Sequence, residues 1–422
     1  MARILLCTFG SYGDLYPYLA LGTELRNRGH AVTVATSPCY AAKVGACSLA
    51  FHPVRPDVSL DDRALLAYVM DAKRGSERLL RYLASVIGES YRDTLPAAQE
   101  TDLIVTHPVT FAAVLAARKL QLPWVSTELA PISFLSAYDP PVLAAAPWLH
   151  PFSRLGPSFA RLWITASRPP TAAWLRPLLD FRRDLGIENG GHPLFEGQHS
   201  PSLVLALFSR CLAEPQPDWP PQTLVTGFPF YDTGEAPPEL DHFLRAGPAP
   251  IVFTLGSSAV GAAGDFYRHS FEAARRMHAR AVFLAGSHPQ GLPENLPASM
   301  IAVDYAPHSS VFPYASVVVH QGGVGTTAQA VRAGHPMLVV PFAHDQFDNG
   351  ERVRRQGAGA VLPHTRYTAA RAEQWLRRLR EQTGYSAAAQ KLAAIVRSES
   401  GTRTACDAIE NVLRSGTHSA SN

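Results

Sequence analysis

The stretch HQGGVGTTAQAVRAGHPMLVVPFAHDQFDN, residues 320–349, decides the fold. The run before it, residues 315–319 (ASVVV), has the length and β-branched composition of a buried strand. Gly322, Gly323 and Gly325 then allow a tight turn that approaches a ligand closely, and a helix-forming segment follows. Strand, glycine turn and helix N-terminus together form an anion site, above all for phosphate.

A second strand and a polar loop follow this turn. Residues 337–340 form the strand, and the loop carries His344, Asp345 and Gln346. In a parallel sheet the turn and the loop open at the same carboxyl-end edge, where α/β proteins bind ligands. Asp345 offers acceptor oxygens and Gln346 offers donors and acceptors, a chemistry suited to sugar hydroxyls. Alternatively, Asp345 has a purely structural role and caps a turn in this loop.

The composition is that of an ordinary globular protein. The chain has 422 residues, enough for two or three domains with their own cores, and 46% of them are hydrophobic. A net charge of +3 is too small to indicate a nucleic-acid partner. The five cysteines are scattered and form no CxxC pair, which favours neither a disulfide framework nor a metal site and fits a reducing compartment.

The N-terminus predicts a cytoplasmic protein without a membrane span. Its apolar run ends at Phe9, before Gly10, which is too short for the core of a signal peptide. No run in the chain approaches 18 uninterrupted apolar residues, so no spanning helix is expected.

The first half of the chain alternates strands and helices. Strand-like runs at residues 3–9, 31–35, 102–106 and 123–127 are separated by helical segments, which favours a parallel doubly wound sheet. The first turn, GSYGD at residues 10–14, places Asp14 at the N-terminal end of a helix and at the ligand edge of the sheet. Asp14 is therefore either a helix cap or a general base.

Residues 131–178 interrupt this alternation with many prolines and aromatic side chains. A long apolar insertion in an α/β domain often forms a binding loop or a lid, so we expect a hydrophobic small-molecule pocket here. Its expected acceptor-binding residues are Tyr12, His107, Phe134, Tyr138, Trp148 and Phe152. Short helices that only cover the sheet are the structural alternative, and peripheral contact with a membrane surface is a lesser one.

A second alternating set follows a Pro/Gly-rich segment. The predicted organisation is an N-terminal domain at residues 1–232, a linker at 233–249, a second domain at 250–400, and a C-terminal helix with a disordered tail at 401–422. A cleft between two α/β halves is then expected to hold the ligand. Ser257 and Ser258 follow a strand in a small-residue turn that faces the same cleft.

The motifs resemble a known family. His320, the three glycines, Thr326, Thr327, Pro341, Asp345 and Gln346 look like the donor-binding signature of the GT-B nucleotide-sugar glycosyltransferases of the family-1 (UDP-glycosyltransferase) type. Residues 305–314 resemble the start of that signature, and residues 10–36 resemble the family's acceptor-side loop and first helix. The closest likeness is to bacterial rhamnosyltransferases and sterol glucosyltransferases. The resemblance implies two Rossmann-like domains that face each other across a cleft.

The resemblance also implies an inverting transfer without a metal, in which a nucleotide sugar is the co-substrate and no cofactor stays bound. The diphosphate would be held by His320 and the amides of Gly323, Gly325 and Thr326, and Gly322 and Thr327 would also belong to the donor site. Tyr305 and His308 would lie at the base, Ser257 or Ser258 would touch phosphate or acceptor, and Asp345 and Gln346 would bind the sugar. Many members carry a catalytic His in the first turn; Asp14 stands there, so Asp14 and His320 are the expected catalytic residues. His107 is a lesser candidate for the base.

The donor and acceptor stay open at this point. UDP-glucose with a phenolic, lipid or sterol acceptor is favoured, and dTDP-rhamnose with a hydroxy fatty acid is the alternative. Ala328 stands where plant-type members carry a Glu for the ribose hydroxyls, so a deoxyribose donor remains open. A UDP-sugar 2-epimerase and a non-catalytic sugar-nucleotide-binding protein are further alternatives.

Overall fold

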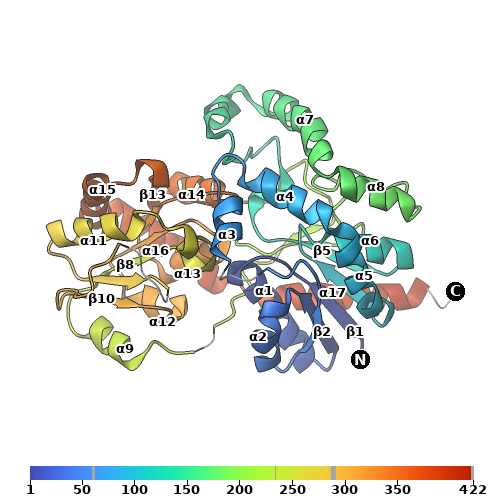
Figure 1. Ribbon diagram of the computed structural model, residues 1–422, viewed down its shortest axis with the longest axis horizontal. Helices are drawn as coiled ribbons and strands as arrows, with labels where there is room; N and C mark the ends of the chain where they lie inside the picture. The colour runs from blue at the N-terminus through green and yellow to red at the C-terminus, as the bar shows by residue number, and fades with distance from the viewer. Residues whose placement is uncertain (59–61, 233, 287–290, 420–422) are drawn as a thin grey trace.

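The computed structural model describes residues 1–58, 62–232, 234–286 and 291–419. Each half of the chain builds one parallel β-sheet, and apolar clusters on both faces of each sheet bury it under helices (Figure 1). The expectation of two doubly wound α/β units is confirmed. The side chain of Ser258 lies outside what the structure describes.

The N-terminal sheet has the strand order β3-β2-β1-β4-β5-β6-β7. Its strands are β1 (Arg3–Cys7), β2 (Ala31–Thr36), β3 (Ala50–Pro53), β4 (Leu103–Thr106), β5 (Trp124–Glu128), β6 (Val204–Ala206) and β7 (Thr223–Val225). The strand order reverses between β1 and β4, so the loops after these strands diverge and leave a crevice. The sequence did not predict β3, because this edge strand has no buried residue and hence little apolar signal.

The C-terminal sheet has the order β10-β9-β8-β11-β12-β13. Its strands are β8 (Ile251–Thr254), β9 (Ala281–Leu284), β10 (Met300–Val303), β11 (Val317–His320), β12 (Met337–Val339) and β13 (Gly359–Val361). The reversal between β8 and β11 places a second crevice beside the glycine turn that follows β11. Both crevices open toward the space between the two units.

The helices of the N-terminal unit are α1 (Tyr12–Asn27), α2 (Ala41–Ala46), α3 (Arg63–Val69), α4 (Gly75–Ser85), α5 (Ile87–Gln99), α6 (Phe111–Leu120), α7 (Pro157–Trp174) and α8 (Arg176–Asp184). Those of the C-terminal unit are α9 (Pro238–Arg245), α10 (Gly256–Ala259), α11 (Phe266–Arg276), α12 (His308–Val311), α13 (Val324–Ala333), α14 (Gln346–Arg355), α15 (Ala369–Glu381) and α16 (Thr383–Ser398). The predicted linker contains α9, whose Leu240 and Leu244 are buried in the core of the C-terminal unit.

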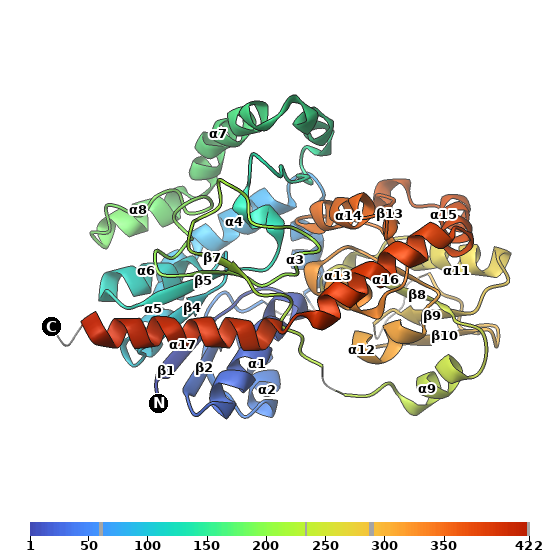
Figure 2. The same cartoon turned by 180° about the vertical axis from the view of Figure 1, so that it is seen from behind.

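The last helix returns to the first unit. Helix α17 (Gly401–Ser419) continues from α16 after a bend and packs against α1 (Figure 2). Arg28 of α1 forms ion pairs with Asp407 and Glu410 of α17. The helix extends to Ser419, into the stretch expected to be disordered, and residues 420–422 lie outside the described residues.

A buried ion-pair network also joins the two units. Arg352 of α14 is 2% exposed and bonds Asp348 on its own helix at 2.7 Å. Its guanidinium also pairs with Asp139, which follows the N-terminal strand β5 in the chain, and donates to the carbonyl of Leu212. Arg355 adds a second bond to Asp139 at 2.9 Å. These contacts join α14 to the N-terminal unit.

Candidate functional site

Two adjoining cavities occupy the cleft between the units. The first, of about 320 Å³, is lined by several aromatic side chains, and we call it the aromatic cavity. The second, of about 400 Å³, is lined mainly by aliphatic side chains, and we call it the aliphatic cavity. Both cavities touch the same strip of residues, which consists of Gly13, Leu129, Ser257, Val324, Gly325 and Thr326. A ligand that extends through this strip would occupy both cavities.

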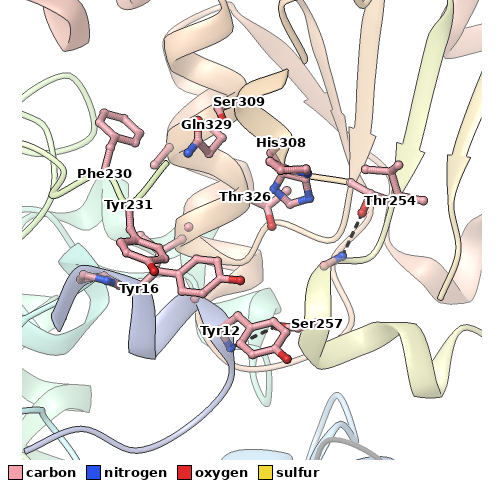
Figure 3. Close-up of a pocket in the computed structure, with 18 of the residues that line it drawn as sticks. Tyr12, Tyr16, Phe230, Tyr231, Thr254, Ser257, His308, Ser309, Thr326 and Gln329 are labelled. Atoms are coloured by element: carbon pink, nitrogen blue, oxygen red, sulfur yellow. Dashed lines mark hydrogen bonds between the residues drawn. The ribbon is translucent and has the colours of Figure 1, made fainter. Parts of the chain in front are cut away.

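Two helix N-termini from opposite units meet at this strip. The backbone N–H of Tyr12, at the start of α1, donates to Oγ of Ser257 at 3.2 Å (Figure 3). Gly13 and Gly325 lie so close that a Cβ on Gly325 would be 3.3 Å from Cα of Gly13. Small residues on both sides therefore let the first turns of α1 and α13 approach each other, and the positive ends of both helix dipoles lie at the junction of the cavities.

The glycine turn after β11 leaves the first backbone N–H groups of α13 without a capping side chain. Gly322 has φ +93°, and a Cβ there would lie 2.7 Å from Cγ1 of Val339 and 2.8 Å from the carbonyl oxygen of Gln346. Gly323 is the N-cap of α13 and provides no capping side chain. The hydroxyl of Thr327 donates a hydrogen bond to the carbonyl of Gly323, and the side chain is fully buried. This side chain therefore stabilises the turn and does not face the cavities. The first amides of α13 are thus the available anion donors.

His320 lies beneath this turn and lines neither cavity. The ring is fully buried, and its Nδ1 accepts a hydrogen bond from the backbone N–H of Gly322 at 3.1 Å. Burial lowers the pKa of His320 to about 3, so the ring is neutral and Nε2 carries the proton. Among the described residues Nε2 has no hydrogen-bond partner. The observed contact fixes the glycine turn through its backbone.

The aromatic cavity receives side chains from both units. Tyr305 is 53% exposed and its hydroxyl lies 3.3 Å from that of Tyr16 in α1. His308 stacks on Phe312, and burial lowers its pKa to about 4. Figure 3 shows Tyr12, Tyr16 and Tyr231 in the lower part of the view, His308 and Thr326 above and to the right of them, and Phe230 beside Gln329 at the upper left. The structure thus places Tyr12, which we expected beside the acceptor, in the same cavity as Tyr305.

The residues after the α13 N-terminus link this cavity to the end of the first unit. Ala328 lines the cavity with a methyl group and offers no polar atom. The next residue, Gln329, donates from Nε2 to Asp232 at 3.0 Å, and Arg332 pairs with the same carboxylate at 2.6 Å. The position at which plant-type members of the resembled family carry a Glu is therefore apolar in this chain.

Asp14 stands at the other end of the shared strip, in the aliphatic cavity. Its Oδ2 accepts hydrogen bonds from the backbone N–H of Ser11 at 2.7 Å and from the Ser11 hydroxyl at 3.2 Å, which completes a capping box. Gly10 makes room for the carboxylate, since a Cβ there would lie 2.3 Å from Oδ2. Asp14 is therefore a helix cap and a carboxylate with a fixed orientation that is 32% exposed.

His107 approaches Asp14 from the end of β4, across the switch point of the N-terminal sheet. Its Nε2 lies 3.4 Å from Oδ1 of Asp14, and its Nδ1 accepts from the backbone N–H of Val109 at 3.3 Å. Because a backbone N–H can only donate, Nδ1 is unprotonated in the neutral ring and Nε2 carries the hydrogen. His107 is thus a donor to Asp14, and the ring itself is 7% exposed.

The loop before α14 brings Asp345 and Gln346 to the aliphatic cavity. Burial, with the nearby charge of Asp14, raises the pKa of Asp345 to about 7. Gln346 uses its Oε1 to accept from the backbone N–H groups of Phe342 and Ala343, so only its amide hydrogens are left for a ligand. Asn349 ties this loop to the glycine turn, because its amide donates to Gly322 and to Asp345.

The aliphatic cavity takes more of its aliphatic lining from α3 and α4 than from the proline-rich insertion, which contributes only Ile132 and Ser133. Its aliphatic wall consists of Val58, Leu65, Leu66, Val69, Met70, Leu79, Leu80, Val109, Leu129, Ala130, Ile132 and Val324. Phe134 packs in the core, stacked on Trp219 with ring centroids 3.9 Å apart. Tyr138, Trp148 and Phe152 are exposed and line neither cavity. Of the six expected acceptor residues, only His107 lines this cavity.

Several site residues lacked a signal in the sequence. Ser11 and Asn349 act through hydrogen bonds to Asp14 and to the glycine turn, and the motif spacing does not show such bonds. The wall from α3 and α4 has the apolar spacing of ordinary core helices. In the described part of the chain, no group of three or more His, Cys, Asp or Glu side chains could hold a metal ion, and no helix is long and apolar enough to cross a membrane.

Comparison with known families matches both halves of the chain. Residues 4–138 match the glycosyltransferase family 28 N-terminal domain, and residues 272–409 match the erythromycin biosynthesis protein CIII-like, C-terminal domain. The chain is 31% identical over 423 residues to O-mycaminosyltylonolide 6-deoxyallosyltransferase of Streptomyces fradiae, with 97% of each chain covered. It is 27% identical to sterol 3-beta-glucosyltransferase of Leptosphaeria maculans, covering 85% of this chain but only 25% of that protein.

Solved structures share the fold over nearly the whole chain. The glycosyltransferase of kitacinnamycin superposes with a TM-score of 0.71 at 22% identity, covering 98% of this chain and 99% of that chain. The glycosyltransferase VinC, solved in complex with dTDP, gives a TM-score of 0.70 at 22% identity, covering 98% and 100%. At these identities the likeness establishes the two-unit fold alone.

Proposed function

Because this chain belongs to the GT-B glycosyltransferases, we propose that it transfers a hexose from a nucleoside diphosphate to a hydroxyl group of an aliphatic acceptor, with inversion at the anomeric carbon. The observation that carries this proposal is the junction of the two cavities. There the amides of α13 face the fixed carboxylate of Asp14 across a strip lined by Gly13 and Gly325. One cavity then holds the nucleotide and the other the acceptor.

In the proposed reaction, Asp14 takes the proton from the acceptor hydroxyl. The acceptor oxygen forms a bond to the anomeric carbon as the bond from that carbon to the diphosphate oxygen breaks. The leaving electron pair stays on the diphosphate, where the open amides of α13 stabilise it together with the helix dipole. Asp14 later releases the proton to solvent. His107 orients Asp14 and does not take the proton itself, since its Nε2 is already a donor.

The sugar is proposed to lie beside the loop that begins α14. Asp345 would accept from sugar hydroxyls, and Gln346 would donate to them, because its oxygen is already used by the backbone. His320 contributes by holding the amide of Gly322, and direct donation from its Nε2 to the diphosphate would need the buried ring to become accessible. Tyr305 and His308 would flank the base in the aromatic cavity.

We favour a dTDP-6-deoxyhexose as the donor. The methyl group of Ala328 offers nothing to a ribose 2′-hydroxyl, which fits a deoxyribose. The 31% identity to a 6-deoxyallosyltransferase and the dTDP complex of VinC support the same choice. UDP-glucose, which the sequence alone favoured, is the alternative.

The wall of the second cavity supports an acceptor that is saturated and not flat. Twelve aliphatic side chains line it, against the two large aromatic rings of Phe9 and Tyr82. Such a surface suits a sterol, a lipid or a macrocyclic alcohol better than a flat phenolic ring, which gains most from aromatic stacking. A phenolic acceptor is therefore the weaker alternative.

A donor and acceptor screen with the purified protein tests the proposal. dTDP-rhamnose and UDP-glucose are each incubated with a sterol, a macrolide aglycone, a hydroxy fatty acid and a flavonoid, and products are detected by mass spectrometry. We expect a hexosylated aliphatic acceptor and the release of one nucleoside diphosphate. Conversion of the sugar nucleotide without an acceptor would indicate an epimerase, and nucleotide binding without turnover would indicate a binding protein. Either outcome overturns the proposal.

A further inference from the structure

The proline-rich insertion ends in an arm that the proposed reaction does not use. The arm consists of the short helix η3 (Pro147–Leu155) and α7, which together cover residues 147–174. It projects away from both sheets on the side of α4, as both ribbon views show (Figure 1). Helix η3 has no buried residue, and α7 buries only Ala160. Although α7 contacts α4 and α8, an 18-residue helix with a single buried residue leaves most of its surface uncovered by the described chain.

The tip of the arm presents large apolar side chains to solvent. Trp148 is 65% exposed, Phe152 46%, Leu155 65% and Leu162 67%. These four account for nearly half of the large hydrophobic side chains that the described residues leave exposed. All four lie within residues 148–162, on two helices that contact each other, and exposed apolar side chains gathered in this way mark a site of interaction.

The charge of the arm has one sign. Residues 140–179 contain four arginines and one histidine, but no Asp, Glu or Lys. Arg168 and Arg176 pair with Glu196 and Asp180. Arg154 and Arg161 are exposed beside Leu155 and Leu162, and neither forms an ion pair with any described residue. The whole chain carries nearly balanced charges, with 38 basic and 35 acidic residues, so an acid-free segment of 40 residues is a local property.

These features favour an anionic partner over a second copy of the chain. In a two-fold dimer the same patch would face itself, which would place arginines opposite arginines with no carboxylate between them. Exposed Trp, Phe and Leu beside arginines, on a convex projection, instead suit the boundary between lipid headgroups and acyl chains. There the apolar side chains enter the acyl region and the guanidinium groups stay with phosphate.

We propose that the arm of residues 147–174 docks the protein on the surface of an anionic lipid bilayer. Leu155 and Leu162 enter the bilayer boundary, and Arg154 and Arg161 bind lipid phosphates. The enzyme is then held at the membrane surface without crossing the bilayer. Helix α4 contacts α7 and also lines the aliphatic cavity, so it lies between the membrane-bound arm and that cavity. This inference does not depend on the identity of the donor or of the acceptor.

Co-sedimentation of the full chain with sucrose-loaded vesicles tests the proposal. We expect binding to phosphatidylcholine vesicles that contain phosphatidylglycerol, weaker binding to phosphatidylcholine alone, and weakening by salt, because exposed charges are screened. The double variants L155S/L162S and R154Q/R161Q should each lower the vesicle partition coefficient at least about tenfold. The variant I395S, which changes an exposed apolar residue on α16, should bind as the wild type does.

As a control, the thermal unfolding midpoint of each variant is compared with that of the wild type to establish that the variant is folded. Equal sedimentation with both vesicle types and no effect of L155S/L162S would overturn the proposal. So would size-exclusion chromatography that shows a wild-type dimer converted to a monomer by L155S/L162S, because the arm would then be a contact between copies. Absence of vesicle binding together with capture of an acidic protein by the arm would also contradict it.

Discussion

The imidazole Nε2 of His107 lies 3.4 Å from Oδ1 of Asp14, and the backbone N–H of Val109 fixes the tautomer in which Nε2 is the donor. The carboxylate is therefore held from two sides, by His107 and by Ser11. The loop after β1 and the loop after β4 supply these residues, and they meet only because the two strands are neighbours at the switch point of the sheet.

His107 is predicted to position Asp14 rather than to bind substrate. H107L removes the donor and should lower kcat about 10-fold to 100-fold with the donor KM nearly unchanged, because a misoriented base costs rate more than binding. H107Q keeps an amide donor at similar reach and should recover part of the loss. Steady-state kinetics separate the two parameters. Equal losses in H107L and H107Q, or a rise in KM alone, would remove the positioning role.

The glycine turn is predicted to tolerate no side chain at Gly322. G322A places a Cβ 2.7 Å from Val339 and forces an alanine to φ +93°, so it should lower the free energy of unfolding by about 2–4 kcal/mol. G384A in α16 is the matched control, because its Cβ would meet nothing within 4 Å. That change should stabilise the helix by about 0.5–1 kcal/mol. Denaturant titration measures both, and similar values for the two variants would contradict the assignment.

The sequence predicted the glycine turn well because its signal is local. Three glycines after a β-branched run dictate a strand, a turn and a helix N-terminus without any distant contact. The helix begins at Val324, slightly earlier than the threonines suggested, since Gly323 caps it with backbone geometry alone. The position of Asp14 in the first turn of α1 could be anticipated for the same reason, as it follows from the end of a strand.

The wall of the aliphatic cavity could not be predicted in this way. Apolar residues in the insertion and in α3 and α4 look alike in the sequence, and only packing decides which of them face a cavity. Phe134 faces Trp219 in the core, Trp148 faces solvent, and Leu66 faces the aliphatic cavity. The pairing of His107 with Asp14 is likewise a consequence of strand order, which the sequence pattern does not contain.

Buried neutral His320 predicts a loss of stability at acid pH. The pKa is about 6.5 in the unfolded chain and about 3 in the folded one, so between these values the unfolded state binds the extra proton. His320 therefore contributes no pH dependence above about pH 6.5. Below it, this group alone lowers the free energy of unfolding by about 1.4 kcal/mol per pH unit.

The variant H320Q tests this dependence by difference. Denaturant titrations of wild type and H320Q at several values between pH 7 and pH 4 give the free energy of unfolding as a function of pH. The difference between the two proteins should change by about 1.4 kcal/mol per pH unit, with the variant losing less stability on acidification. Contributions from other groups cancel in the comparison. Parallel curves would show that His320 titrates normally in the folded protein.

The buried network around Arg352 is predicted to hold the two units together. R352M leaves Asp348 and Asp139 without their shared partner in a buried place and should cost about 3–5 kcal/mol of stability. R354M on the same helix removes only a surface pair with Glu351 and should cost about 0–1 kcal/mol. Thermal and chemical unfolding compare the two, and a cost of R352M no larger than that of R354M would contradict the role of the network.

The most direct test of the central claim is the rate of sugar transfer by D14N, measured together with nucleotide affinity. Asparagine keeps the size of the side chain but cannot take a proton, so single-turnover transfer should fall at least about 1,000-fold. Binding of dTDP or UDP, measured by calorimetry, should stay within about threefold of the wild type, because Asp14 lies in the aliphatic cavity and not among the residues that line the aromatic one. Transfer by D14N at a rate close to that of the wild type would contradict the account.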